Sequence, residues 1–169
     1  MIEKREILFR AKHVHILPPN GCFDGKWVYG YQCDRYYINP IDRDGDGERS
    51  TSEILIDPDT ICEYTGINDG TRWEQLSKSE QERFLSGWDL KEDRKNTKED
   101  WNGRKIFEGD IIGIGDEDDE IFVVKWDTDT ARFVMDADSW IVDFDSYNGY
   151  DCEVIGNIFD NPELIEGWG

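Results

Sequence analysis

The amino-acid sequence predicts a mainly β protein that ends in a small closed barrel and carries one short inserted helix. Along most of the 169 residues, short apolar or aromatic runs alternate with turn signals rich in Gly, Pro, Asn and Asp, a pattern typical of strands joined by turns. One stretch breaks this alternation. We therefore expect an N-terminal β region over residues 1–69, a partly helical insertion over 70–101 and the barrel over 102–169.

In the N-terminal region, strand-forming segments and turns follow one another along the chain. Ile7, Phe9 and Ala11 alternate with Leu8 and Arg10, and this period of two indicates a strand. The expected strands are residues 5–17, a hairpin over 26–38 interrupted near 32–34, and the short runs 53–56 and 60–64. Turns rich in Pro, Asn and Asp separate them.

The insertion carries signals for the start and the end of a helix. Ser77 and Glu80 have the spacing of a capping box, in which each side chain accepts a hydrogen bond from the backbone of the other residue. Gly87 is placed to end the helix, so we expect a helix over Lys78–Ser86. The segment Leu90–Asp100 is almost free of apolar residues, and we expect a mobile loop there.

From residue 102 onward, the sequence pattern is again that of strands. Asn102-Gly103 is typical of a type I′ hairpin turn, because both residues tolerate positive φ. The expected strands are residues 105–113, 121–126, 131–135, 140–144 and 153–159. Short strands joined by polar turns favour a small closed barrel, which removes the exposed edges of a sheet.

Several segments of the chain resemble the YopX family. They are REILFRA (Arg5–Ala11), GKWVYG (Gly25–Gly30), DPDTICEYTGIND (Asp57–Asp69), NGRKIFEGDII (Asn102–Ile112) and CEVIGNIFDNPELI (Cys152–Ile165). Members of this family are mostly carried by bacteriophages and prophages, and no biochemical role is established for them. The resemblance implies an SH3-like barrel at the C-terminal end, with the N-terminal strands as a second β layer beside it. Similar sequences join the YTG and NG segments through a few residues, so the resemblance also marks residues 70–101 as an insertion.

Negative charge is concentrated in the C-terminal part of the chain. Residues 101–169 contain 18 acidic and 4 basic residues, a net charge of −14, whereas residues 1–100 have a net charge of −6. Such a surface repels a phosphate backbone, so direct binding of DNA or RNA is not expected. A solvated acidic face, a basic protein partner or a cation would each explain the excess, as would mimicry of nucleic acid toward a DNA-binding protein.

Cysteine usage and hydropathy indicate a cytoplasmic protein. The four cysteines, Cys22, Cys33, Cys62 and Cys152, form no C-x-x-C pair, which argues against a zinc or thioredoxin-type site. We interpret them as reduced, partly buried thiols. The charged N-terminus is not that of a signal peptide, and no apolar run approaches the roughly 18 residues of a membrane span.

The segment Asp42–Glu53 has the spacing of an EF-hand calcium loop. Asp42, Asp44 and Asp46 occupy loop positions 1, 3 and 5, Gly47 occupies position 6 and Glu53 position 12. The flanking residues are β-like rather than helical, and Asp and Gly are also common in ordinary exposed loops. A plain loop is therefore favoured, calcium binding stays an alternative, and no metal site is assigned.

Other candidate sites have weaker patterns. His13 and His15 share one face of a predicted strand, but two histidines alone are a weak metal site. No other histidine is present, which leaves little for a Ser-His-Asp or Cys-His catalytic group. Trp27, Tyr29 and Tyr31 alternate along a strand, where packing in a core is favoured over a ligand groove.

Taken together, these patterns predict a cytoplasmic, non-enzymatic module of phage or prophage type that binds a host or phage protein through its acidic barrel. No catalytic residue, cofactor or metal ligand is assigned. Two rival functions stay open. One is a module stabilised by calcium at residues 42–53, and the other is a self-assembling structural protein, a homo-oligomer in which exposed strands pair between copies.

Overall fold

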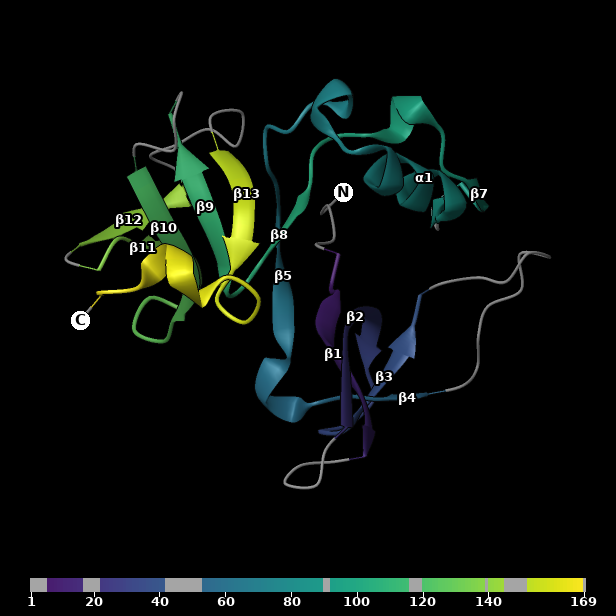
Figure 1. Ribbon diagram of the computed structural model, residues 1–169, viewed down its shortest axis with the longest axis horizontal. Helices are drawn as coiled ribbons and strands as arrows, with labels where there is room; N and C mark the ends of the chain where they lie inside the picture. Colours follow the sequence, from purple (N-terminus) through teal and green to yellow (C-terminus); the bar gives the residue numbers. More distant parts are fainter. Residues whose placement is uncertain are drawn as a thin grey trace. The chain divides into compact units, whose positions relative to one another are not determined.

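Strands dominate the protein, and one α-helix interrupts them in the described part of the chain (Figure 1). The computed structural model describes residues 6–16, 22–41, 53–89, 92–115, 120–138, 140–144 and 152–168. The chain forms two compact units: an N-terminal unit of residues 1–63 with 76–101, and a C-terminal unit of residues 64–75 with 102–169. The predicted mainly β class is confirmed. Residues 64–75 thus group with the C-terminal segment, whereas the sequence placed a division after residue 69.

The N-terminal unit contains antiparallel strands in the order β4-β3-β2-β1-β5. They are β1 (Phe9–Ile16), β2 (Cys22–Gln32), β3 (Tyr37–Pro40), β4 (Ile54–Leu55) and the start of β5 (Cys62–Asn68). Ala11, Ile38 and Ile56 are fully buried and form a small core. Leu8 and Arg10 alternate with Ala11 and are also buried, so both faces at the start of β1 are covered. The strands predicted here are confirmed, with boundaries shifted by up to four residues.

The predicted helix is confirmed as α1 (Lys78–Ser86). Its capping box is formed: Ser77 Oγ accepts a hydrogen bond from Glu80 N at 3.2 Å, and Glu80 Oε2 accepts one from Ser77 N at 3.0 Å. Gly87 ends the helix as predicted, but its φ of −79° is extended rather than left-handed. Phe84 of the helix lies edge-on to Trp101, with ring centroids 5.1 Å apart.

The segment Leu90–Asp100 is not a structureless loop in its described part. Here β7 (Arg94–Lys95) pairs with β6 (Trp88–Asp89), and a 3-10 turn follows at Lys98–Asp100. The Arg94 guanidinium donates two hydrogen bonds of 2.8 Å to the Asp100 carboxylate. The expectation was wrong because it relied on missing apolar residues, whereas polar pairing gives this segment its structure.

The C-terminal unit is built on five antiparallel strands in the order β12-β11-β10-β9-β13. They are β9 (Asp110–Ile114), β10 (Glu120–Asp127), β11 (Arg132–Asp136), β12 (Ile141–Asp143) and β13 (Cys152–Asn157). The chain passes from β9 to β12 as a meander, and β13 returns to pair with β9 (Figure 1). As a result β12 and β13 are the two edges of this sheet. The predicted strands corresponding to β10–β13 are confirmed to within two residues at each end.

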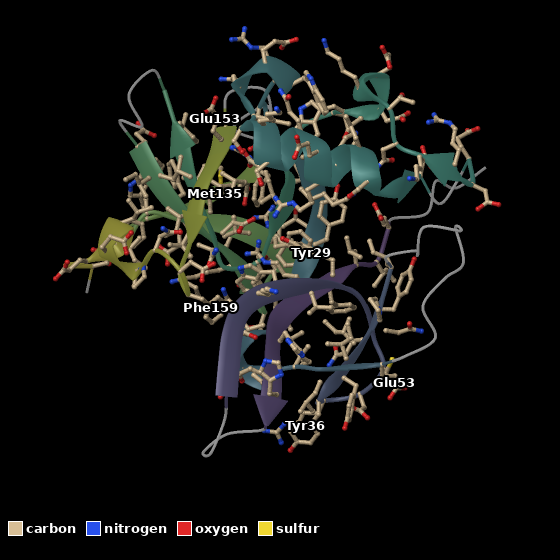
Figure 2. The ribbon with its side chains drawn as sticks, turned by 45° about the vertical axis from the view of Figure 1, so that its right-hand side comes forward. Tyr29, Tyr36, Glu53, Met135, Glu153 and Phe159 are labelled. Atoms are coloured by element: carbon tan, nitrogen blue, oxygen red, sulfur yellow. The ribbon has the colours of Figure 1, made fainter. Side chains whose placement is uncertain are left out.

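The C-terminal unit contains a buried hydrophobic core. Its buried members are Ile106, Ile112, Ile114, Phe122, Val124, Met135, Val142 and Cys152. Most of them alternate along their strands, which places them on one face of the sheet. Met135 lies among the strands of this unit in Figure 2 and is fully buried.

Two details at the start of this unit differ from the prediction. Residues 105–113 are not one strand, because a turn at residues 108–109 separates β8 (Lys105–Phe107), which pairs with β5, from β9. Asn102-Gly103 is not a type I′ turn, since only Gly103 has a positive φ, 102°. A Cβ atom on Gly103 would collide with the carbonyl oxygen of Asp69. Glycine is required there for the close approach of two backbones rather than for a hairpin.

Candidate functional site

The β13 edge of the C-terminal sheet is covered by groups from two other segments. Cys152 O accepts a hydrogen bond from Gly70 N at 2.8 Å, and Val154 N donates one to Asp69 Oδ2 at 2.9 Å. Val154 O accepts a hydrogen bond from the Arg104 guanidinium at 3.3 Å. These backbone groups point away from β9. Because each of them already has a hydrogen-bond partner, they are not available to an additional strand.

Asp69 is the centre of this cover, and sequence reasoning assigned it no role. Its side chain is buried, with 5% of its surface exposed. Oδ1 accepts hydrogen bonds from Thr71 N at 3.0 Å and Arg104 N at 2.7 Å, and Oδ2 accepts from Thr71 Oγ1 and Val154 N at 2.9 Å each. One carboxylate therefore joins three segments that are distant in sequence. The only signal for it in the sequence was its place at the end of DPDTICEYTGIND.

The β12 edge has no such cover among the described residues. Ala137 N donates a hydrogen bond to Trp140 O at 3.0 Å, and Val142 is then the residue that bonds to Met135 across the pair. Alternation turns the N–H and C=O groups of Ile141 and Asp143 away from β11. Within the described part of the chain, no hydrogen bond reaches these outward groups. Ile141 is 64% exposed, more than any other exposed large hydrophobic side chain of the described residues.

Two tryptophans of the β10–β12 hairpins are held by ring contacts and are still exposed. Trp140 is 48% exposed and lies edge-on to Phe122, with ring centroids 5.6 Å apart. Trp126 is 41% exposed and lies edge-on to Phe133 at 5.0 Å. Fixed aromatic side chains with an exposed face are typical anchors of protein interfaces. We refer to the exposed residues of β10–β12 and their turns, centred on Trp126, Trp140 and Ile141, as the β10–β12 surface.

The four basic residues between positions 102 and 169 are all engaged within the C-terminal unit. Arg104 donates to Thr71 and Val154, Lys105 lies over the Tyr64 ring, Lys125 pairs with Asp136, and Arg132 pairs with Asp143 at 2.8 Å. The segment from residue 102 to residue 169 also contains 18 acidic side chains. Among them Asp129 and Asp138, in the two turns of the β10–β12 surface, are exposed. The β10–β12 surface therefore combines apolar anchors with an excess of carboxylates.

Asp127 is an ionised member of this surface. Its Oδ2 accepts a hydrogen bond from Thr130 Oγ1 at 2.6 Å, and its Oδ1 accepts one from Asp129 N at 3.0 Å. The Thr130 hydroxyl is the main cause that holds the pKa of the Asp127 carboxyl below its usual range, followed by the backbone N–H of Asp129. The turn between β10 and β11 thus carries a fixed negative charge at neutral pH.

The two metal-binding patterns considered from the sequence lie only partly within the described residues. Of the EF-hand pattern, Asp42, Asp44 and Asp46 lie outside the described residues, and Glu53 is an exposed residue just before β4. His13 and His15 do lie together, with ring centroids 4.8 Å apart. In the described ranges, however, no group of three His, Cys, Asp or Glu side chains is placed to hold a metal ion.

Trp27, Tyr29 and Tyr31 lie on β2 and differ in exposure. The Trp27 ring lies 4.5 Å from the Arg10 guanidinium and 4.5 Å from the Lys12 ammonium, both on β1. Trp27 and Tyr29 are partly buried, and Tyr31 is 37% exposed. Trp27 therefore packs against two cations, an arrangement that neither the core nor the groove interpretation included.

An open depression of about 680 Å³ lies beside the turn from β2 to β3, with Phe9, Cys33, Arg35 and Ile61 among its lining residues. The labelled Glu53 and Tyr36 belong to the same unit (Figure 2). Partial desolvation and then the Glu53 carboxylate raise the pKa of the Cys33 thiol, so at neutral pH it is a protonated thiol and a weak nucleophile. Cys33, Cys62 and Cys152 are all free thiols.

Residues 98–166 match the family model described as YopX protein. This match spans β8–β13 and so includes both edges of the C-terminal sheet. The N-terminal segments that resemble the family lie outside the matched range. No curated protein matches the chain. No helix in the described residues is long and apolar enough to cross a membrane. Over residues 98–166, the chain is therefore similar to the YopX family.

Proposed function

We propose that the protein is a non-enzymatic binding module whose C-terminal unit holds a basic segment of another protein on the β10–β12 surface. The observation that carries this proposal is the composition of that surface. Trp126, Trp140 and Ile141 are exposed there, and the two cations beside them, Lys125 and Arg132, are already paired with carboxylates. A partner with its own cations and apolar side chains complements both features.

The two features have different roles in binding. Long-range attraction by an acidic unit speeds the encounter with a basic partner and repels nucleic acid, and salt weakens it. Burial of a fixed aromatic side chain supplies affinity that salt does not remove, and truncating such an anchor costs about 1–2 kcal/mol. Trp126 and Trp140 pack on Phe133 and Phe122 on one face of the strands, and Asp136 and Asp143 lie on the other, so a partner segment that alternates apolar and basic residues can contact both features.

The fold supports a binding role rather than a particular reaction. In the C-terminal unit, four strands form a meander and the fifth returns to the first, and this order supports the proposal of an SH3-like barrel made from the sequence. Such barrels are scaffolds whose function depends on the residues they display. We place the protein in the cytoplasm, in contact with a host or phage protein, in keeping with the segments that resemble phage and prophage sequences.

The two rival functions make separate predictions. Self-assembly requires copies with a net charge of −20 each to approach one another, which mutual repulsion opposes. Its signature is a mass by light scattering that rises with protein concentration. Calcium binding at residues 42–53 predicts a melting temperature that rises with added calcium, because a ligand held only by the folded state stabilises it.

The proposal is tested with two synthetic peptides and the full chain. One peptide alternates Lys with Val and the other alternates Glu with Val, and fluorescence anisotropy measures the binding of each at about 50 mM and about 300 mM salt. We expect binding of the Lys-Val peptide alone, weaker at the higher salt. Binding of neither peptide, or equal binding of both, rejects the proposal.

A matched pair of variants locates the binding on the β10–β12 surface. Trp140→Ala should weaken binding of the Lys-Val peptide by about tenfold, because it removes an exposed aromatic anchor. Tyr36→Ala, at a tyrosine of the N-terminal unit that is 38% exposed, should leave the affinity unchanged. Equal losses in both variants would place the binding elsewhere or make it unspecific.

A further inference from the structure

We infer that the β12 edge accepts an extended basic segment, which pairs with Ile141 and Asp143 and adds one strand to the five-stranded sheet. This inference rests on the proposed function and specifies how the partner is held. It concerns the backbone of the edge rather than the side chains of the surface alone. A strand added in this way gains affinity from main-chain hydrogen bonds and specificity from its alternating side chains.

The register of β12 leaves the required groups available. Because Val142 pairs with Met135, the neighbouring residues Ile141 and Asp143 present their N–H and C=O groups on the opposite side of the strand. These are the positions at which an incoming strand exchanges hydrogen bonds. Among the residues that the structure describes, none occupies them. The strand is three residues long, so the site fits a short extended segment.

The β12 edge contains neither Lys nor Pro, and its protection against pairing is selective. Exposed edges of native sheets are typically protected by charged side chains, by Pro, by a bulge, by a short strand or by a covering segment. In β12 the charged side chain is Asp143, which opposes an acidic strand and not a basic one. The strand reads Ile141-Val142-Asp143, with regular pairing to β11 and an isoleucine that is 64% exposed. The opposite edge of the same sheet is covered by Asp69, Gly70 and Arg104. Within the described residues, the C-terminal unit therefore covers the β13 edge and leaves the β12 edge able to pair.

Charge selects a basic occupant over a second copy of this chain. Asp143 lies on the pairing strand itself, and the exposed Asp138 lies in the turn before it. A second β12 would bring its own Asp143 and the rest of a unit with the same excess of acids, and like charges oppose that pairing. A segment with Lys or Arg at alternate positions would place these cations near Asp143 and Asp136. Its apolar side chains would then lie on the other face, beside Trp140.

Hydrogen exchange of the full chain tests the pairing directly. We expect the Lys-Val peptide to slow amide exchange of Ile141 and Asp143 by at least about tenfold, because both N–H groups become hydrogen-bonded. Two further peptides carry N-methyl groups on every Lys or on every Val, which removes the donors from one edge of the peptide or the other. One of the two should bind at least about tenfold more weakly than the Lys-Val peptide.

The variant Ile141→Lys, with its matched control Ile7→Lys, completes the test. Ile7 is 57% exposed and lies in the N-terminal unit. Ile141→Lys should weaken binding of the Lys-Val peptide by at least about tenfold, because a lysine on an edge strand opposes pairing and repels a cationic segment. Ile7→Lys should bind as the unaltered protein does, and circular dichroism confirms that both variants are folded.

The outcomes separate this inference from the proposed function. If the Lys-Val peptide binds while exchange at Ile141 and Asp143 is unchanged, or if both N-methylated peptides bind as well as the parent, strand addition is wrong and the proposed function stands. If no cationic peptide binds the full chain, both are wrong.

Discussion

The two edges of the C-terminal sheet differ in the hydrogen-bond partners of their outward backbone groups. At the β13 edge, the outward backbone groups of Cys152 and Val154 are bonded to Gly70, Asp69 and Arg104. At the β12 edge, Ile141 and Asp143 have no such partner in the described part of the chain, and Ile141 is 64% exposed. Both edges belong to one sheet and lie within the range that matches the YopX family.

This difference predicts which part of the unit contributes most to stability and, under the proposed function, which part binds a partner. At the β13 edge, the buried Asp69 carboxylate bonds the backbone of Val154 and of Arg104, and unfolding would break these hydrogen bonds. An uncovered strand edge, in contrast, is open to pairing with another strand. The β12 edge should contribute less to stability, since in the described part of the chain its outward groups have no hydrogen bond that unfolding would break. Substitutions at the β13 edge should therefore mainly change the free energy of unfolding, and those at the β12 edge should mainly change binding.

The largest expected effect is that of Asp69→Ala. The substitution removes the acceptor of four hydrogen bonds and leaves the buried N–H group of Thr71 and the partly buried N–H groups of Arg104 and Val154 without it. We expect a loss of about 3 kcal/mol or more in the free energy of unfolding, because buried donors without a partner are costly. Urea denaturation of the full chain, followed by circular dichroism, measures it.

Asp138→Asn is the control for removal of a carboxylate. Asp138 is exposed and has a φ of 70°, a conformation that Asn tolerates well. Its free energy of unfolding should stay within about 0.5 kcal/mol of the unaltered protein. A similar small effect for Asp69→Ala would mean that the β13 edge does not depend on this cover.

Gly103→Ala should be the next most damaging change. Gly103 combines a φ of 102° with a close approach to the Asp69 carbonyl oxygen, which a Cβ would contact. We expect a loss of about 2–4 kcal/mol, since strain and a steric clash act together. Gly167→Ala is the matched control, because Gly167 has a φ of 92° and open space around its Cβ position. Equal losses in the two variants would show that φ alone, and not the approach to Asp69, is responsible.

How much of this could be predicted from the sequence depends on the distance between the residues involved. The helix α1 was predicted to the residue, because its capping box joins Ser77 to Glu80 within one turn. Strands were located by their alternation, which is also a local signal. The role of Asp69 depends on partners 35 and 85 residues away, and no local pattern contains that information.

The position of β12 at the edge of the sheet could not be predicted from the sequence for a related reason. Its alternation marks Ile141–Asp143 as a strand, but only the strand order shows that it lies at the edge of the sheet. The same limit explains the error at Asn102-Gly103. The prediction that Gly103 has a positive φ was correct. The backbone that approaches it is that of Asp69, however, and not that of a hairpin partner. The excess of carboxylates was visible throughout, because charge is a property of composition.

Amide exchange of the free protein compares the two edges without any substitution. The Val154 N–H is bonded to Asp69, whereas those of Ile141 and Asp143 point away from β11 with no acceptor among the described residues. We expect the latter two to exchange at least about tenfold faster than Val154, because a bonded amide must open before it exchanges. Equal rates at 141, 143 and 154 would indicate that the β12 edge is covered in solution.

The smallest effect on stability is expected for Arg132→Gln, which removes one cation from the β10–β12 surface. The Arg132 side chain is 48% exposed and that of its partner Asp143 is 40% exposed. An exposed ion pair contributes little, so the free energy of unfolding should change by at most about 0.5 kcal/mol. Binding of a cationic segment should become stronger, because Asp143 loses its neutralising partner Arg132 and becomes available to that segment. The affinity for the Lys-Val peptide should rise by a few-fold at low salt, and fluorescence anisotropy measures the change.

Arg94→Gln is the control that distinguishes the β12 edge from overall charge. Arg94 makes the same kind of ion pair with Asp100 in the insertion and is 44% exposed. The two variants have the same net charge, so an equal gain in affinity would assign the effect to the charge of the whole chain. A gain in Arg132→Gln alone assigns it to the neighbourhood of Asp143, since screening confines the influence of an exposed charge to about 10 Å at moderate salt. That result would locate the basic partner at the one edge of the sheet that the described residues leave uncovered.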